Sequence, residues 1–88
     1  MDQQEIAIYV KARCRRCRRA RRLLRRRGYA FEVTDVPGDD ELRNWLVGAT
    51  GSKTVPQVFV DGRLVGGLAV VRALDNSGDL ERLVRGAV

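Results

Sequence analysis

The chain of 88 residues is long enough for one domain, which we expect to span residues 1–88, and no apolar run approaches the roughly 20 residues of a membrane-spanning helix. Histidine is absent, which excludes Ser-His and Cys-His catalysis and sites that hold zinc or haem through imidazole. The formal net charge of +6 is concentrated at one end, since residues 1–27 carry 11 basic and 2 acidic side chains and ten of the basic ones are arginines.

The first third of the chain predicts a parallel βαβ unit. Residues 1–5 are acidic and polar, so no secretory signal is expected and the predicted location is cytoplasmic. Residues 5–10 and 29–36 have the composition of strands, and residues 15–27 have that of a helix that can end at Gly28. The apolar residues that share one face of this helix are Cys17, Ala20, Leu23 and Leu24. Two strands joined by a helix and short loops lie parallel, with a right-handed crossover.

A second helix is predicted in the middle of the chain. Asp39 or Asp40 can cap it, and we expect it to run to about Gly48 before a loop over residues 50–53. Its expected apolar face comprises Leu42, Trp45, Leu46 and Ala49.

The last third predicts a hairpin and a helical C-terminus. Residues 55–60 and 63–65 are β-rich runs separated by an Asp-Gly pair, a signal for a two-residue hairpin turn. Gly66 and Gly67 end the second run, and apolar residues at helical spacing then predict a helix followed by a last amphipathic helix. These apolar residues are Leu68, Val71, Leu74, Leu80, Leu83 and Val84. The predicted order is therefore β-α-β-α-β-β-α with a terminal helix.

The two cysteines, Cys14 and Cys17, have C-x-x-C spacing between the first strand and the first helix. Two cysteines cannot complete a four-ligand zinc site in one chain, and a disulfide across so short a loop contributes little stability. A redox pair is therefore favoured over two incidental cysteines. Because the N-terminus of a helix favours a thiolate, Cys14 is the expected nucleophile and Cys17 the expected resolving thiol.

The tripeptide Thr54-Val55-Pro56 places a proline at the start of the third predicted strand. Proline has no N–H to donate to a sheet, so it occurs at strand starts, and a cis peptide bond after Val55 is a second explanation. The tripeptide alone favours an ordinary trans proline.

Together these motifs resemble the glutaredoxin family, from about Glu5 to Val84. The segments that carry the resemblance are K-x-x-C-x-x-C at residues 11–17, T-V-P-Q-V-F-V-D-G at 54–62, the glycine pair at 66–67 and residues 73–80. The resemblance implies a thioredoxin fold, with a four-stranded mixed sheet, helices on both faces and a cis proline at Pro56 that faces the cysteines. It also implies a thiol–disulfide oxidoreductase that uses glutathione as reductant or co-substrate and needs no metal.

The resemblance further implies a glutathione-binding site. Lys11 matches the family lysine that meets a glutathione carboxylate, and the backbone of Val55 is expected to pair with the glutathione cysteine. Arg43 lies where relatives carry a polar or basic residue near the glycine end of glutathione. The glycine pair would let the tripeptide lie against the backbone. The complete expected set is Lys11, Arg43, Thr54, Val55, Pro56, Gly66 and Gly67.

Two features depart from the family pattern. Two arginines stand between the cysteines, where relatives often carry a tyrosine at the second position. Leu68, Ala69 and Val70 follow the glycine pair, where the family has one or two aspartates that anchor the γ-glutamyl amine. The missing aspartates leave open a redoxin that is reduced by a partner reductase and makes little use of glutathione. Arg15, which stands where many relatives have proline, leaves open a module that binds an iron–sulfur cluster between two chains through Cys14 and glutathione.

The expected partners are disulfide-containing or glutathionylated proteins, and we expect a monomer. The arginines from Arg13 to Arg27 have two interpretations. They can face an acidic protein surface, or they reflect an arginine-rich composition in which the alkyl stems cover the edge of the core. Nucleic acid is disfavoured because no aromatic stacking platform lies in the basic segment, and no membrane partner is expected.

Overall fold

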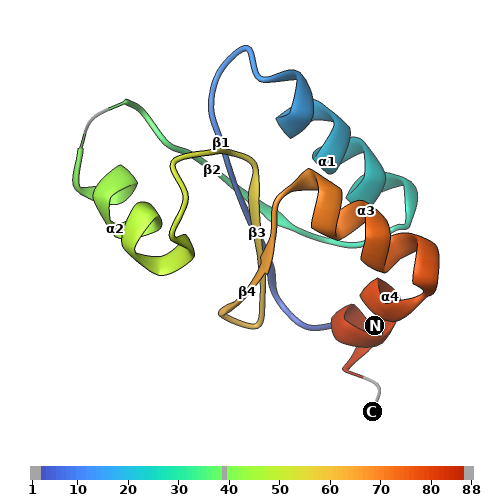
Figure 1. The fold of residues 1–88 in the computed structure, drawn as a ribbon. Helices are drawn as coiled ribbons and strands as arrows, with labels where there is room; N and C mark the ends of the chain where they lie inside the picture. The colour runs from blue at the N-terminus through green and yellow to red at the C-terminus, as the bar shows by residue number, and fades with distance from the viewer. Residues whose placement is uncertain (1–2, 39, 87–88) are drawn as a thin grey trace.

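The computed structural model describes residues 3–38 and 40–86, and its centre is a four-stranded mixed sheet in the order β2-β1-β3-β4 (Figure 1). Strand β1 runs parallel to β2 and antiparallel to β3, and β3 runs antiparallel to β4. The strands are β1 (Ile6–Val10), β2 (Glu32–Asp35), β3 (Gln57–Val60) and β4 (Arg63–Gly66). The helices are α1 (Arg15–Arg26), α2 (Glu41–Thr50), α3 (Leu68–Ser77) and α4 (Asp79–Arg85). This arrangement confirms the predicted element order and the predicted mixed sheet.

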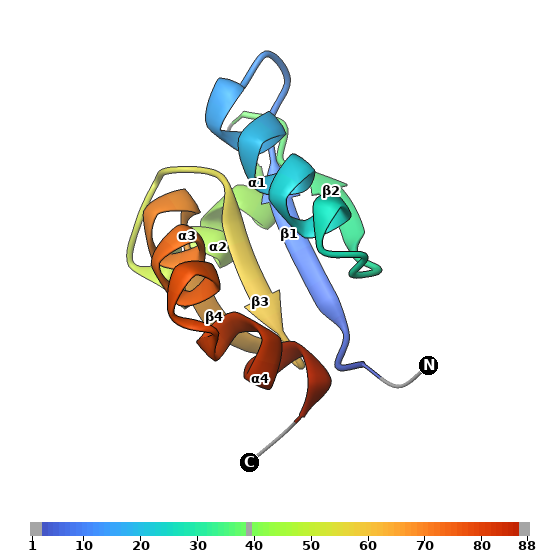
Figure 2. The same cartoon turned by 90° about the vertical axis from the view of Figure 1, so that its right-hand side faces the viewer.

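The two faces of the sheet pack against different helices (Figure 2). Alternate residues of β1 point to opposite faces, as the pleat of a strand requires. Ile6, Ile8 and Val10 join the main core, to which α1, α3 and α4 contribute. Ala7 and Tyr9 face a smaller cluster that includes Leu46 of α2 and Phe59 of β3. Helices therefore cover both faces, as the resemblance implied.

Helix α1 is held against the rest of the molecule by its apolar stripe and by an ion pair of Arg27. The four residues predicted for the stripe are all buried, namely Cys17, Ala20, Leu23 and Leu24. Gly28 follows the helix with a φ of 77°, which confirms it as the residue that ends α1. The guanidinium of Arg27 donates to both carboxylate oxygens of Asp75 in α3, at 2.8 and 2.9 Å. This pair joins the C-terminal part of α1 to that of α3.

Several strand boundaries differ from the sequence prediction. Three differ by one residue, since β1 begins at Ile6, β2 ends at Asp35 and β4 includes Gly66. The starts of β2 and β3 differ by more. Strand β2 begins at Glu32 rather than at residue 29, because the Tyr29 side chain is buried in the core and the Ala30 N–H donates to the Gln3 side chain at 2.9 Å. Strand β3 begins at Gln57 rather than at residue 55, since Pro56 has no N–H for the sheet. The peptide bond before Pro56 is cis, which confirms the resemblance and corrects the preference for trans.

The turns and caps largely follow prediction. Asp61 and Gly62 have φ values of 52° and 76°, the left-handed conformations of a tight hairpin turn. The Asp40 side chain accepts a hydrogen bond from the Arg43 backbone N–H at 3.0 Å and caps α2, whereas Asp39 lies outside the described residues. Helix α2 continues to Thr50, two residues beyond the predicted end, and stops at Gly51.

Not every residue of the predicted apolar faces is buried. Trp45 and Ala49 of α2 and Leu83 of α4 are exposed. Trp45 still packs by its ring against Tyr9 and Phe59, with ring centroids 5.7 and 6.0 Å away. No helix in residues 3–38 and 40–86 is long and apolar enough to cross a membrane.

The packing of α1 predicts a large stability difference between two leucine positions. Leu24 is fully buried in the main core, whereas Leu83 is 44% exposed. Leu24→Ala should lower the free energy of unfolding by about 2–5 kcal/mol, because it removes buried methyl groups and leaves a cavity. Leu83→Ala, the matched control on another helix, should cost less than about 1 kcal/mol. Urea denaturation of both oxidised variants measures the difference, and equal losses would contradict this packing.

Candidate active site

The two cysteines lie at the N-terminus of α1, joined by a disulfide, with their Cα atoms 5.2 Å apart. Cys14 is the residue that caps the helix, in an extended backbone conformation. The Cys17 backbone N–H donates to the Cys14 Sγ atom at 3.2 Å. The helix thus uses a sulfur atom where serine or aspartate usually serves as the cap, and this sulfur accepts a hydrogen bond from the first turn of the helix.

The two sulfur atoms differ in accessibility. Cys14 is half-buried, whereas Cys17 is 1% exposed and belongs to the main core. A molecule that approaches from solvent therefore meets Cys14 first. Because the N–H groups and the dipole of α1 favour negative charge at this position, the geometry is that of an accessible sulfur stabilised as a thiolate.

Residues that follow α2 approach the cysteines from the opposite side. The carbonyl oxygen of Val55 lies 4.0 Å from the Cys14 Sγ atom, and Pro56 is buried beside it. The start of α3 lies close behind, since a Cβ atom on Gly67 would be only 3.3 Å from the carbonyl oxygen of Pro56. Glycine at position 67 therefore lets α3 begin against this segment.

A groove of about 410 Å³ lies between these elements. The residues that line it come from α1, from the segment before β3 and from the start of α3. They are Arg16, Arg19, Thr54, Val55, Pro56, Gly67, Leu68, Ala69 and Arg72. The groove is thus bounded by the helix that carries the cysteines and by the backbone that faces them.

The structure brings only part of the expected glutathione set into this groove. Thr54, Val55, Pro56 and Gly67 line it. Lys11 is exposed before α1, and Gly66 lies at the end of β4, where a Cβ atom would be 3.0 Å from the Val70 side chain. Arg43 belongs to α2, which packs on the other face of the sheet.

Arg16, Arg19 and Arg72 line the groove but are not in the expected glutathione-binding set. Arg16 and Arg19 are three residues apart on one helix, each directly before a residue of the buried stripe. That spacing was a usable signal, because positions beside a buried stripe border whatever lies next to the helix. No local pattern brings Arg72 to the same place, since it depends on how α3 packs beside α1.

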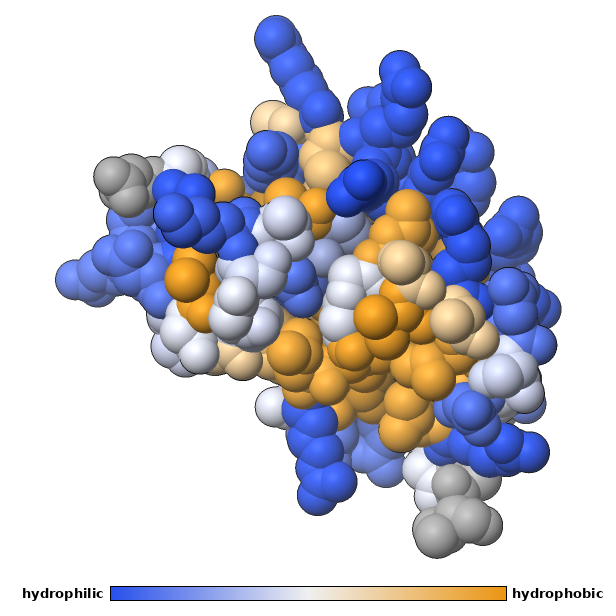
Figure 3. Space-filling view, viewed as in Figure 1, coloured by the Kyte–Doolittle hydropathy of each residue, from blue (hydrophilic) through white to orange (hydrophobic). Residues whose placement is uncertain are grey.

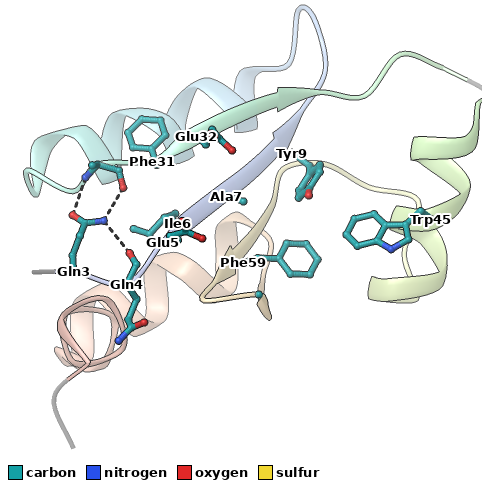
Figure 4. Close-up of a pocket in the computed structure, with 12 residues that line it drawn as sticks. Gln3, Gln4, Glu5, Ile6, Ala7, Tyr9, Phe31, Glu32, Trp45 and Phe59 are labelled. Atoms are coloured by element: carbon teal, nitrogen blue, oxygen red, sulfur yellow. Dashed lines mark hydrogen bonds between the residues drawn. The ribbon is translucent and has the colours of Figure 1, made fainter.

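A larger hollow of about 610 Å³ lies on the other face of the sheet and has no cysteine in its lining (Figure 4). The rings of Tyr9, Trp45 and Phe59 lie together on one side of this hollow. On the other side, the Gln3 side chain forms hydrogen bonds with the backbone of Ala30. Within the described residues, no three His, Cys, Asp or Glu side chains gather as metal ligands. The groove beside the disulfide is therefore the candidate active site.

Comparison with known proteins agrees with this geometry. The glutaredoxin family profile matches residues 6–65. A probable glutaredoxin of Synechocystis is 37% identical over 81 residues, which cover 91% of this chain and 92% of that relative. The chain belongs to the glutaredoxin family. Members of this family are oxidoreductases, so the Cys14–Cys17 pair of this glutaredoxin is the redox pair of a thiol–disulfide oxidoreductase.

Solved glutaredoxin structures share the fold. The solution structure of glutaredoxin from Brucella melitensis has a TM-score of 0.85 and 32% identity, and the match covers 100% of this chain and 97% of that one. The crystal structure of a buckwheat glutaredoxin–glutathione complex has a TM-score of 0.83 and 25% identity, over 94% of this chain and 80% of that one. These matches confirm the thioredoxin fold of this glutaredoxin.

The unequal burial of the sulfur atoms predicts selective alkylation. In the reduced protein, iodoacetamide should modify Cys14 well before Cys17, because Cys17 is shielded by the core. The midpoint pH of the Cys14 reaction should fall below about 8.5, the value of an unperturbed cysteine. Mass spectrometry of peptides from timed reactions measures both quantities. Urea-unfolded protein is the control, in which the two cysteines should react alike.

Proposed function

We propose that this glutaredoxin reduces protein disulfides and glutathione mixed disulfides, with Cys14 as the nucleophile and Cys17 as the resolving thiol. The observation that carries the proposal is the pairing of an accessible sulfur at the N-terminus of α1 with a second sulfur in the core within disulfide reach. This geometry allows the first sulfur to attack a bulky substrate and the second to attack only the first.

The reaction consists of two exchanges. The Cys14 thiolate attacks one sulfur of the substrate disulfide, a bond forms between them, and the other substrate sulfur leaves as a thiolate that takes a proton from solvent. The Cys17 thiolate then attacks the Cys14 sulfur and releases the remaining substrate thiolate. Two electrons pass from the dithiol to the substrate, and the Cys14–Cys17 disulfide remains.

Glutathione is the proposed reductant. Two molecules of glutathione would reduce the Cys14–Cys17 disulfide and leave as oxidised glutathione, so that thiols and electrons balance. The buckwheat structure, which contains glutathione, supports the assignment. The groove also supports it, because the backbone of Val55 lies beside Cys14, where an extended tripeptide could pair with it.

Single cysteine variants test the two roles. Cys14→Ser should abolish reduction of every disulfide, because no accessible nucleophile remains. Cys17→Ser should still reduce a glutathione mixed disulfide, since a second glutathione can attack the intermediate at Cys14, but it should lose reduction of protein disulfides. A coupled assay with glutathione and its reductase measures the first activity, and insulin reduction measures the second.

Two results would contradict this division of roles. One is equal loss of both activities in Cys17→Ser. The other is activity of the unmodified protein with thioredoxin reductase and none with glutathione, which would assign the chain to redoxins fed by a partner reductase.

The groove also predicts how glutathione use can be improved. Ala69 lines the groove in the first turn of α3, and no acidic side chain lines it to meet the ammonium of glutathione. Ala69→Asp should lower KM for a glutathione mixed disulfide about fivefold, equivalent to about 1 kcal/mol for one charge-assisted hydrogen bond after desolvation. Ala73→Asp, an equal change of charge at an exposed position outside the groove, is the control and should leave KM unchanged.

A further inference from the structure

Three arginines border the groove beside the redox pair. Arg16 and Arg19 come from α1, and Arg72 comes from α3. All three are exposed, and no hydrogen bond or ion pair joins their side chains to any residue in 3–38 or 40–86. No aspartate or glutamate lines the groove. The three guanidinium groups are therefore available to whatever enters it.

The N-termini of two helices add partial positive charge to the groove. The first turns of α1 and α3 both border the groove, at Arg16 and at Leu68. Each helix N-terminus behaves as a partial positive charge, so the dipoles act in the same direction as the arginines. A substrate ammonium is repelled here and a substrate carboxylate is attracted. The larger hollow on the other face differs in this respect, because Glu5 and Glu32 line it.

Beside the groove the surface changes from cationic to apolar. Figure 3 shows hydrophilic side chains projecting along the edge where α1 lies and a hydrophobic area over α3 and β4. The large apolar side chains exposed on β4, α3 and α4 are Leu64, Val70 and Leu83. Glutathione, a small polar tripeptide, would leave this apolar area exposed, whereas a protein segment can cover it.

We infer that this groove selects protein disulfides in which acidic residues neighbour the attacked cysteine. The inference rests on the proposed function and names its substrate class. Arg16, Arg19 and Arg72 attract the carboxylates of the substrate segment, while Leu68 and Ala69 contact its apolar side chains. The chemistry is unchanged: the Cys14 thiolate displaces one substrate sulfur, Cys17 displaces the other, and an added thiol reduces the protein again.

Model peptides of equal length test the selection. Each peptide carries one cysteine as a mixed disulfide with 2-mercaptoethanol, flanked by glutamates, glutamines or lysines. The reduced protein should react fastest with the glutamate peptide and slowest with the lysine peptide, at least tenfold apart at low ionic strength, as expected for electrostatic steering. The ratio should fall as salt is added, because exposed charges are screened.

Two triple variants locate the effect. Arg16→Gln, Arg19→Gln and Arg72→Gln together should bring the glutamate-to-lysine ratio to within about threefold. The control changes Arg22, Arg26 and Arg63 to glutamine, which removes the same charge from exposed positions outside the groove. The control should keep both the wild-type ratio and the wild-type rate with the neutral peptide. Circular dichroism of each variant verifies folding, and the peptide series with wild type alone already tests the preference.

Each contrary result has a distinct meaning. If the glutamine peptide is reduced and the glutamate and lysine peptides react equally, the inference is wrong and the proposed function stands. If both triple variants lose the preference equally, overall charge and not the groove is responsible, and the inference is wrong. Two small disulfides extend the test: dithiodiglycolate carries two carboxylates, and bis(2-hydroxyethyl) disulfide is neutral. If the protein prefers the charged one by the same factor by which it prefers the glutamate peptide over the glutamine peptide, the groove selects small anions and not protein segments, and the inference is wrong. If no disulfide is reduced, the proposed function fails and the inference fails with it.

Discussion

The burial of one stripe of α1 against the sheet is the interaction on which the site depends. Cys17 is part of that stripe, together with Ala20 and Leu24, so the redox pair cannot move without moving the core. The same packing places the first turn of α1 at the end of β1 and leaves Cys14 as its cap. Fold stability and the position of the accessible sulfur therefore have a common cause.

The second wall of the groove is built from distant parts of the chain. The Val55–Pro56 backbone faces Cys14, and Gly67 lets α3 start directly against it. Close backbone approach rather than a set of polar side chains gives this wall its shape. The positive charge of this wall has a different origin. Arg72 lies one turn further along α3, and it is close to the arginines of α1 because the two helices pack side by side. The shape of this wall and its charge therefore depend on different residues.

The elements were predictable from sequence because each has a clear period or turn signal, as in the stripe of α1 and the Asp61-Gly62 turn. The cis bond before Pro56 was predictable only through family resemblance, since the tripeptide itself favours trans. Strand β2 begins at Glu32 and not at residue 29, because the Gln3 side chain, from another segment, forms hydrogen bonds with the N–H and C=O groups of Ala30. Arg72 joins the groove through tertiary packing, which periodicity within one helix does not encode.

The ion pair between Arg27 and Asp75 joins α1 to α3 at a distance from the redox pair. It connects α1 and α3 near their C-terminal ends, whereas the groove lies between their N-terminal ends. Arg27 and Asp75 hold the two helices together at the end away from the redox pair, while the buried side chains of Leu68 and Val71 fix α3 in the core at the groove end. A substitution of Arg27 or Asp75 would therefore alter the contact between α1 and α3 without changing any residue that lines the groove.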